Sequence, residues 1–220
     1  MATASNNVLA IANSKGGVGK STLATNLAVE ATLSGLSVLL VDTDPQASSA
    51  VFAATRDESR PAFRLIQMSQ PILHREIPEL AEPYDLVILD TGARENKTFR
   101  SALAAAHRVL VPITPSAYDI WASEDVFALI DEIGSTRDLE TRVVLNQVIP
   151  RTRVAQEALE ALAELTDELG AVLVNTRIHA RVAWKMAIGE GLSVTEYEPS
   201  GAAAAELRAL WRELGYQPRR

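Results

Sequence analysis

The stretch ANSKGGVGKST, residues 12–22, contains the glycines and lysines of a phosphate-binding loop. A short apolar run of strand type, VLAIAN, precedes it, and the helical spacing of TLATNLAVEATLSG follows it and ends at Gly35. A glycine-rich turn between a strand and a helix directs backbone N–H groups toward an anion at the helix N-terminus. The stretch therefore predicts a nucleotide site, in which Lys20 reaches the outer phosphates and the Ser21 hydroxyl ligates magnesium.

The loop departs from the strict pattern GxxxxGK followed by Ser or Thr. Ser14 stands where the first glycine is expected, and Lys15 adds a second lysine to the loop. Two cations this close would repel each other if both served the same phosphates from one side. We therefore expect Lys15 to point away from its own loop, toward the phosphates of a nucleotide held by another subunit. The alternative is a solvated lysine without a role.

The segment KGGVGKST resembles the deviant Walker A motif of ParA/MinD-type ATPases. The resemblance extends over nearly the whole chain and implies a P-loop fold with a sandwich homodimer formed on ATP. In that dimer the signature lysine reaches the ATP of the partner subunit. The resemblance also implies that the loop binds ATP or ADP through Lys15, Gly16, Gly17, Val18, Gly19, Lys20, Ser21 and Thr22.

Length and composition narrow the class of protein. With 220 residues and 47% hydrophobic composition, the chain can bury a sizeable core as a single domain, residues 1–220. The absence of cysteine excludes disulfides and iron–sulfur clusters, and with them the nitrogenase iron-protein branch of the superfamily. No apolar run approaches the ~18–20 residues that span a bilayer, and no signal peptide pattern is present, so we expect a cytoplasmic protein. The net charge of −7 leaves only a local patch to meet DNA.

Apolar runs recur along the chain and are continuous rather than alternating, as expected for strands of a parallel sheet covered on both faces. They span residues 37–42, 84–90, 108–114, 142–148 and 171–176. Helical patterns lie between them, most clearly at 117–134 and 154–170, whereas the proline-containing residues 50–83 are hard to interpret. This alternation predicts an α/β fold: a doubly wound, mostly parallel sheet with helices on both faces and a ligand at the carboxyl ends of the strands.

Aspartates follow two of these apolar runs, with Asp42 and Asp44 after one and Asp90 after another. A carboxylate at the tip of a buried strand needs a cation or a donor, and phosphate-bound Mg²⁺ is such a cation. The resemblance refines these roles, because Asp90 occupies the Walker B position and Asp42 matches the first aspartate of the family's DxDPQ stretch, both near the magnesium waters. Asp44 matches the second aspartate, which positions or activates the attacking water. An N-cap or turn role is the alternative for each.

Two further positions are interpreted through the resemblance. Asn146 matches a family asparagine that faces the adenine, and a buried asparagine that bonds to the backbone is an equal alternative. After Asp90 the chain reads DTGARENKTFRSAL, which departs from the paired prolines that the family often has there. That departure leaves the role of Arg94 open.

The C-terminal region carries basic side chains that could meet DNA phosphates through sequence-independent, salt-sensitive contacts. Arg181 and Lys185 are spaced i,i+4 on a predicted helix and so share a face, with Arg177 one turn earlier. Ordinary solvated or ion-paired side chains are the alternative for each, and the loop with Arg151 and Arg153 is the next candidate. The apolar stripe of the final helix could bind a membrane, but we expect it to pack in the core.

The resemblance implies a slow, magnesium-dependent ATPase whose ATP-bound dimer binds DNA non-specifically and positions a plasmid, a chromosome region or a protein cargo. A ParB-like adaptor on the cargo would stimulate hydrolysis to ADP, and the protein would be nucleoid-associated when ATP-bound. Two alternatives are a MinD-like membrane-cycling ATPase and a metabolic P-loop enzyme resembling dethiobiotin synthetase. We favour the first function because no set of residues for a small acceptor accompanies the nucleotide site. The sequence names neither the cargo nor the adaptor.

Overall fold

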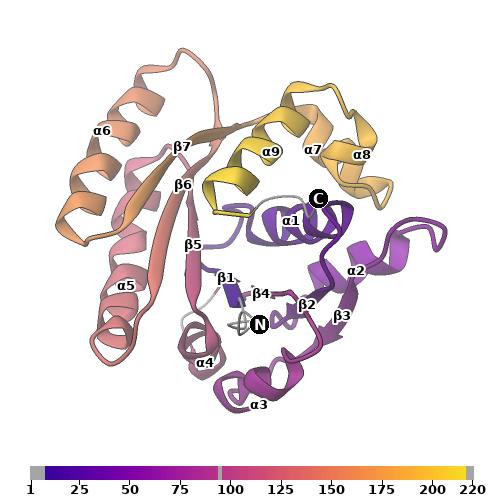
Figure 1. Ribbon diagram of the computed structural model, residues 1–220. Coiled ribbons are helices and arrows are strands. Elements are labelled where there is room, and N and C mark those ends of the chain that lie inside the picture. Colours follow the sequence, from indigo (N-terminus) through magenta and orange to yellow (C-terminus); the bar gives the residue numbers. More distant parts are fainter. Residues whose placement is uncertain (1–7, 94–95, 217–220) are drawn as a thin grey trace.

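A single parallel sheet organises the chain (Figure 1). The computed structural model describes residues 8–93 and 96–216, and within these ranges the seven strands run in the order β3-β2-β4-β1-β5-β6-β7 with every neighbouring pair parallel. The strands are β1 (Val8–Ile11), β2 (Val38–Asp42), β3 (Arg64–Gln67), β4 (Leu86–Asp90), β5 (Arg108–Ile113), β6 (Glu140–Val148) and β7 (Val172–His179). The predicted doubly wound α/β fold is therefore confirmed.

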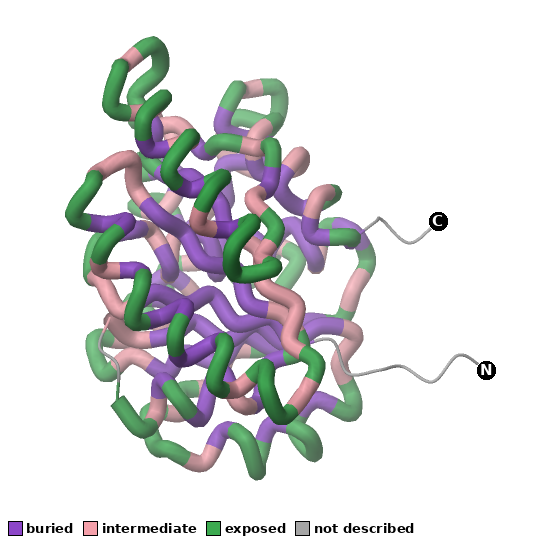
Figure 2. Tube along the Cα trace, turned by 90° about the vertical axis from the view of Figure 1, so that its left-hand side faces the viewer, coloured by how far each residue is buried: buried purple, intermediate pink, exposed green. Residues whose placement is uncertain are grey.

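Helices cover both faces of the sheet (Figure 1). One face buries apolar side chains of α3, α4, α5 and α6, and the other buries those of α1, α7, α8 and α9. The helices are α1 (Lys20–Leu33), α2 (Ser48–Thr55), α3 (Leu73–Leu80), α4 (Lys97–Ala105), α5 (Ala117–Gly134), α6 (Arg153–Glu168), α7 (Val182–Gly189), α8 (Val194–Tyr197) and α9 (Ala202–Glu213). Figure 2 shows the buried chain passing through the strands, with exposed residues on the outer turns of the helices.

The amino-acid sequence explains which strands are easy to predict. β2 reads VLLVD and β4 reads LVILD, and every residue of both is buried between the two helical layers. β3 lies at the edge of the sheet, where its RLIQ sequence is partly exposed and contains no continuous apolar run, so sequence patterns do not predict it. β7 extends to His179, past the predicted end at residue 176. The prediction ends too early because the residues of β7 vary between exposed and buried and do not form one apolar block.

The final helix packs as expected. The apolar residues of its stripe are all buried against α1 and the sheet: Leu207, Leu210, Trp211 and Leu214. No helix within the described ranges is long and apolar enough to cross a membrane.

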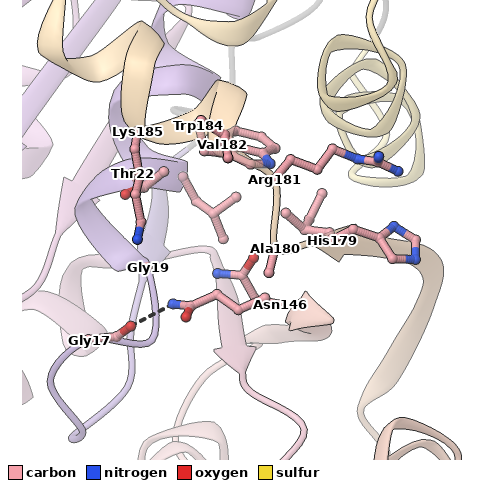
Figure 3. A pocket seen from close by; sticks show the side chains of 13 residues that line it. Gly17, Gly19, Thr22, Asn146, His179, Ala180, Arg181, Val182, Trp184 and Lys185 are labelled. Carbon is pink, nitrogen blue, oxygen red and sulfur yellow. Dashed lines mark hydrogen bonds between the residues drawn. The ribbon is translucent and has the colours of Figure 1, made fainter. Parts of the chain in front are cut away.

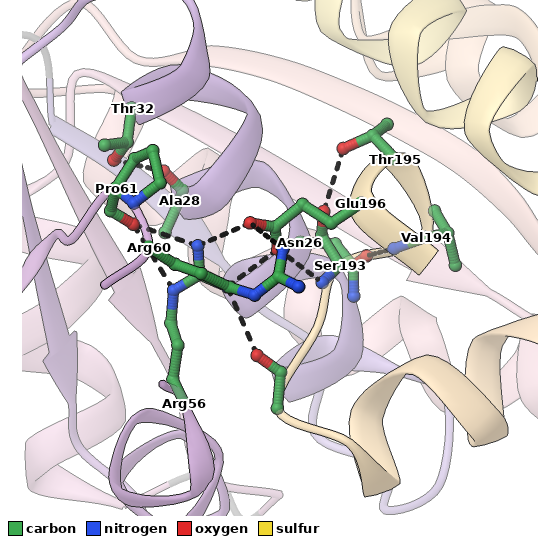
Figure 4. A network of polar contacts seen from close by, with 11 residues as sticks. Asn26, Ala28, Thr32, Arg56, Arg60, Pro61, Ser193, Val194, Thr195 and Glu196 are labelled. Atoms are coloured by element: carbon green, nitrogen blue, oxygen red, sulfur yellow. Dashed lines mark hydrogen bonds and ion pairs between the residues drawn. The ribbon is translucent and has the colours of Figure 1, made fainter. Parts of the chain in front are cut away.

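A buried ion pair joins α2 to α8 (Figure 4). Two guanidinium nitrogens of Arg56, at the C-terminal end of α2, lie 2.7 Å from the carboxylate oxygens of Glu196, and both side chains are only 6% exposed. Beside this pair, the backbone N–H of Val194 donates to Asn26 Oδ1 of α1 at 2.9 Å. These contacts fix α8 against both α1 and α2.

Replacing Arg56 with alanine should lower the free energy of unfolding by about 3 kcal/mol, because Glu196 then stays buried with only the more distant Arg60, at 3.6 Å, as a cationic partner. Burial by itself raises the pKa of Glu196, but the hydrogen bonds from Arg56 hold that pKa below its usual 4.5. The pair therefore stabilises the fold above pH 4.5 and loses its effect as the pH falls through the lower folded-state pKa. Urea unfolding at neutral pH and again below pH 4.5 measures both effects.

The matched control is Arg153→Ala, which breaks an ion pair with Glu157 whose side chains are 87% and 56% exposed. Because water screens such a pair, the control should unfold at nearly the same urea concentration as the parent protein. An equally small effect of Arg56→Ala would mean that the Arg56–Glu196 pair does not stabilise the fold.

Candidate nucleotide-binding site

The glycine-rich loop leaves β1 at Ile11 and enters α1 at Lys20. Gly17 and Gly19 have φ values of 80° and 91°, in the left-handed region that side chains disfavour. At Gly19 a Cβ would also clash with Nδ2 of Asn146, so only glycine fits there. The first turn of α1 contains no acidic residue, and the positive end of the helix therefore faces the loop without a counter-charge from that turn.

Side-chain amides at the end of β6 hold this loop in place. Asn146 Nδ2 donates to the Val18 carbonyl at 2.7 Å. Gln147 Nε2 donates to the Gly17 carbonyl at 2.6 Å, and Figure 3 marks this bond at Gly17 with a dashed line. Asn146 thus bonds to the backbone, which is one of the two roles considered for it. Its side-chain oxygen points into the pocket. Contact of this oxygen with an adenine stays a prediction. The sequence does not predict a role for Gln147 in the site. Its φ of 56° lies in the left-handed region that residues other than glycine rarely adopt, so the surrounding structure holds its backbone in this conformation.

Lys20 lies enclosed within the loop. Its side-chain ammonium donates to the Lys15 carbonyl at 2.8 Å, and the residue is only 6% exposed. Burial lowers the pKa of Lys20, while the nearby carboxylates of Asp90 and Asp44 act in the opposite direction. The ammonium therefore lies between the loop and the aspartates, and its contact with the outer phosphates stays a prediction.

The register of the sheet brings two of the predicted metal-site carboxylates together. Asp42 of β2 pairs directly with Asp90 of β4, and both are buried. Burial raises the pKa of Asp90 to about 7, although the Ser49 hydroxyl donates to its Oδ2 at 2.7 Å and the nearby Ser21 hydroxyl also lowers it. Among the described residues, Asp90 Oδ1 has no hydrogen-bond partner.

A buried carboxylate oxygen without a partner fits a water molecule of a hydrated magnesium ion. Ser21 and Asp42 lie beside Asp90, so the residues present are compatible with magnesium held next to a phosphate. Within residues 8–93 and 96–216, no three His, Cys, Asp or Glu side chains gather into a metal site of their own.

Asp42 and Asp44 also accept backbone hydrogen bonds, which is the turn role considered for them. Asp42 accepts from the N–H groups of Asp44 at 3.1 Å and Ala50 at 3.0 Å, and Asp44 Oδ1 accepts from the Gln46 N–H at 2.9 Å. Burial raises the pKa of Asp42. Asp44 is half-buried and lines a cleft of about 460 Å³ together with Gly92, so its second oxygen can meet a water molecule there.

Beside the loop, a pocket of about 430 Å³ opens between α1, the end of β6 and the segment from β7 to α7 (Figure 3). Its volume suits a small organic ligand such as a nucleoside. The pocket is lined by Gly17, Gly19, Thr22, Leu23, Asn146, Gln147, Ile178, His179, Ala180, Arg181, Val182, Trp184 and Lys185. The loop, the carboxylates and the pocket all lie at the carboxyl ends of strands of the parallel sheet, after β1, β2, β4 and β6.

Lys15 directs its ammonium to α5. It forms an ion pair with Asp119 in the first turn of that helix, and Asp119 also accepts a hydrogen bond from the Thr114 hydroxyl. The Lys15 side chain is 40% exposed and that of Asp119 is 10% exposed. Asp119 is not predicted as a site residue, since the two positions are far apart in the sequence. The intersubunit role of Lys15 stays a prediction, and it requires this ion pair to open.

The arrangement predicted for the three DNA-contact candidates is wrong. Arg177 lies in β7, Arg181 is the extended N-cap of α7 with a φ of −116°, and only Lys185 lies within α7. The three cannot share a helix face because β7 continues through Arg177. Arg181 forms an ion pair with Glu206 of α9 at 2.6 Å, and Lys185 lines the pocket described above.

Arg177 instead belongs to a different surface feature. It lines a groove of about 520 Å³ together with Arg151, in the turn after β6, and Arg153, the first residue of α6. The groove therefore contains the loop that is the second DNA-contact candidate. Arg94, whose role the sequence leaves open, lies outside the described residues.

Comparisons with known proteins agree with this architecture. A family model described as the CobQ/CobB/MinD/ParA nucleotide binding domain matches residues 9–194. Maintenance of carboxysome distribution protein A from Halothiobacillus neapolitanus is 30% identical over 90% of this chain and 91% of its own, and that from Gloeobacter kilaueensis is 35% identical over 94% and 93%. The chromosome-partitioning ATPase Soj from Thermus thermophilus is 29% identical over 94% of each chain.

Solved structures share the fold. Apo McdA from Cyanothece superposes with a TM-score of 0.81 at 16% identity, covering 95% of this chain and 99% of its own. The cell division ATPase MinD from Pyrococcus furiosus superposes with a TM-score of 0.78 at 20% identity, covering 96% and 98%. At these identities the likeness concerns the arrangement of strands and helices.

Proposed function

We propose, from the premise that the chain belongs to the ParA/MinD/McdA family of deviant Walker A ATPases, that it is a slow magnesium-dependent ATPase that positions a cargo on DNA. ATP joins two subunits into a dimer, the dimer binds DNA without regard to sequence, and hydrolysis to ADP releases it. A ParB-like adaptor on the cargo stimulates hydrolysis, and the ATP-bound protein is associated with the nucleoid. Relatives named for carboxysome distribution and for chromosome partitioning both support a positioning role.

One observation carries the nucleotide chemistry: the buried Lys20, Asp42 and Asp90 meet below the glycine-rich loop, and one oxygen of Asp90 lacks a partner among the described residues. The loop N–H groups and Lys20 bind the phosphates, and Asn146 faces the adenine. Ser21, Asp42 and Asp90 would hold magnesium directly or through water, and the ion would neutralise charge that develops on the phosphate oxygens. Asp44 positions the attacking water.

Dimer formation depends on Lys15. Its exposed ammonium exchanges Asp119 for the phosphates of the nucleotide on the facing subunit. This exchange is favourable only when a highly charged triphosphate is present, because the ion pair within the subunit already satisfies the lysine. The dimer is therefore a property of the ATP-bound state.

The groove lined by Arg151, Arg153 and Arg177 is the best-supported DNA contact. The ion pair of Arg153 with Glu157 is exposed and therefore weak, so Arg153 can exchange it for a phosphate. Arg181, in contrast, is held by Glu206 through two hydrogen bonds of 3.0 Å and 2.6 Å. A single groove on an acidic protein binds DNA weakly, whereas a dimer presents two grooves and meets about twice as many phosphates.

Duplex retention by the purified protein tests this function. Retention should require ATP, ignore sequence and weaken as salt rises, with a log–log slope of ~0.9 for each phosphate neutralised. Arg177→Gln should weaken retention and reduce that slope by ~0.9 for each phosphate that is no longer neutralised, while ATP-driven dimerisation is unchanged. Arg181→Gln removes the same charge from a side chain already paired with Glu206, so its effect should be smaller.

Equal DNA affinity with ADP and with ATP would contradict the switching mechanism. Retention on liposomes in place of DNA would favour the MinD-like alternative, and turnover that needs a small metabolite would favour the dethiobiotin synthetase-like one.

A further inference from the structure

The pocket beside the glycine-rich loop contains a cation that the proposed mechanism does not use. Lys185 extends from α7 into the pocket, and Figure 3 shows its side-chain nitrogen directed toward Gly19 and Thr22 at the start of α1. Lys185 thus approaches the nucleotide loop from the side opposite Asn146. The DNA-contact role predicted for it from the sequence stays a prediction.

Lys185 is exposed, and no side chain of the described residues compensates its charge. Over the part of the chain that the structure describes, Lys185 forms no ion pair and no hydrogen bond, whereas its neighbour Arg181 is paired with Glu206. The nearest part of α1 has no acidic residue in its first turn. Lys185 and the positive end of α1 therefore face the same space, and an anionic ligand bound there would interact favourably with both.

The place of Lys185 along the pocket selects one part of the ligand. Lys20 lies beneath the loop beside Asp90 and Asp44, at the end proposed for the outer phosphates. The side-chain oxygen of Asn146 lies at the end proposed for the base. Lys185 and Thr22 line the same pocket as Asn146, and Thr22 follows Lys20 by two residues in the first turn of α1. The group that belongs between the base with its sugar and the outer phosphates is the phosphate attached to the sugar.

We propose that Lys185 binds the phosphate attached to the sugar of the nucleotide held by its own subunit. This inference rests on the proposed nucleotide site. ADP and ATP share that phosphate, so Lys185 raises the affinity for both nucleotides by the same factor and does not distinguish them. AMP gains from the contact as well, and adenosine does not.

Lys185→Gln should weaken ADP and ATP binding alike, each by about tenfold, which corresponds to one hydrogen bond between charged groups. Competition against a fluorescent ADP analogue, with the full chain and magnesium, measures the affinities for ATP, ADP, AMP and adenosine. AMP should lose affinity by the same factor, and adenosine should bind the variant and the parent equally. Lys185→Arg keeps the charge and should recover part of the affinity.

Lys97→Gln is the matched control, because Lys97 is an exposed lysine at the start of α4 and does not line the pocket. It should bind every ligand as the parent protein does. Unchanged ADP affinity in Lys185→Gln would overturn the inference, and so would an equal loss for adenosine, which would mean that the substitution alters the shape of the pocket. Loss of DNA retention with normal ADP affinity would return Lys185 to DNA contact. If the parent protein binds neither ADP nor ATP, the proposed function itself is wrong.

Discussion

Replacing Asp44 with asparagine should reduce ATP hydrolysis by about 100-fold or more, the range expected for a group that activates water, while ATP affinity stays nearly unchanged. Asparagine retains the oxygen that accepts the hydrogen bond from the Gln46 N–H, so the turn after β2 is preserved. The substitution removes only the negative charge at the cleft beside Gly92. Single-turnover hydrolysis and equilibrium ATP binding, measured on the same preparation, separate the two effects.

The chain offers a close control in Asp57. Its Oδ1 accepts from the Ser59 N–H at 2.8 Å, the same local turn that Asp44 makes, but it lies on an exposed loop after α2. Asp57→Asn should hydrolyse ATP at the parental rate. If Asp44→Asn also hydrolyses ATP at the parental rate, the role assigned to Asp44 is wrong. Lys20→Ala completes the set, because it should lose nucleotide binding itself and not only hydrolysis.

Lys15→Gln should abolish the ATP-dependent dimer and leave the affinity of the monomer for ADP nearly unchanged, because the Lys15 ammonium pairs with Asp119 of α5 and Lys15 does not line the pocket of its own subunit. The side chain turns toward α5 and away from the enclosed position that Lys20 occupies. Light scattering with a slowly hydrolysed ATP analogue measures the dimer directly. A dimer of unchanged strength would reduce Lys15 to a surface lysine paired with Asp119.

Asp119→Asn tests the other half of the ion pair. Asparagine still accepts the hydrogen bond from Thr114 but no longer neutralises Lys15. Freeing this lysine should leave dimerisation intact or strengthen it, so the two substitutions should act in opposite directions. Loss of the dimer in both variants would mean that the ion pair supports the interface as a unit.

The sequence predicts best where one local pattern determines the structure. Residues 12–22 predict the strand, the turn and the helix around the loop, and uninterrupted apolar runs predict β2 and β4. Asp42 and Asp90 can be placed at strand ends for the same reason. Their direct pairing cannot be predicted, because it depends on β4 lying between β2 and β1 in the sheet.

Prediction fails where the determining contact is distant in the sequence or the apolar signal is weak. The partner of Lys15 is Asp119, and the amide that holds Gly17 belongs to Gln147, and neither contact has a local signature. The sequence pattern places Arg177 on a helix because the end of β7 alternates in exposure and lacks an apolar run. Because Arg177 is predicted in a helix and lies in a strand, the prediction groups it with Arg181 and Lys185, from which the folded chain separates it.

α7 forms one wall of the pocket, and the contacts of α8 fix it in place before any ligand binds. α8 follows α7 after a short turn and is tied to α1 through Val194 and Asn26 and to α2 through Glu196 and Arg56. A ligand that enters such a preorganised site orders few additional side chains, so little conformational entropy is lost on binding. We therefore expect ADP to be replaced by ATP without local refolding.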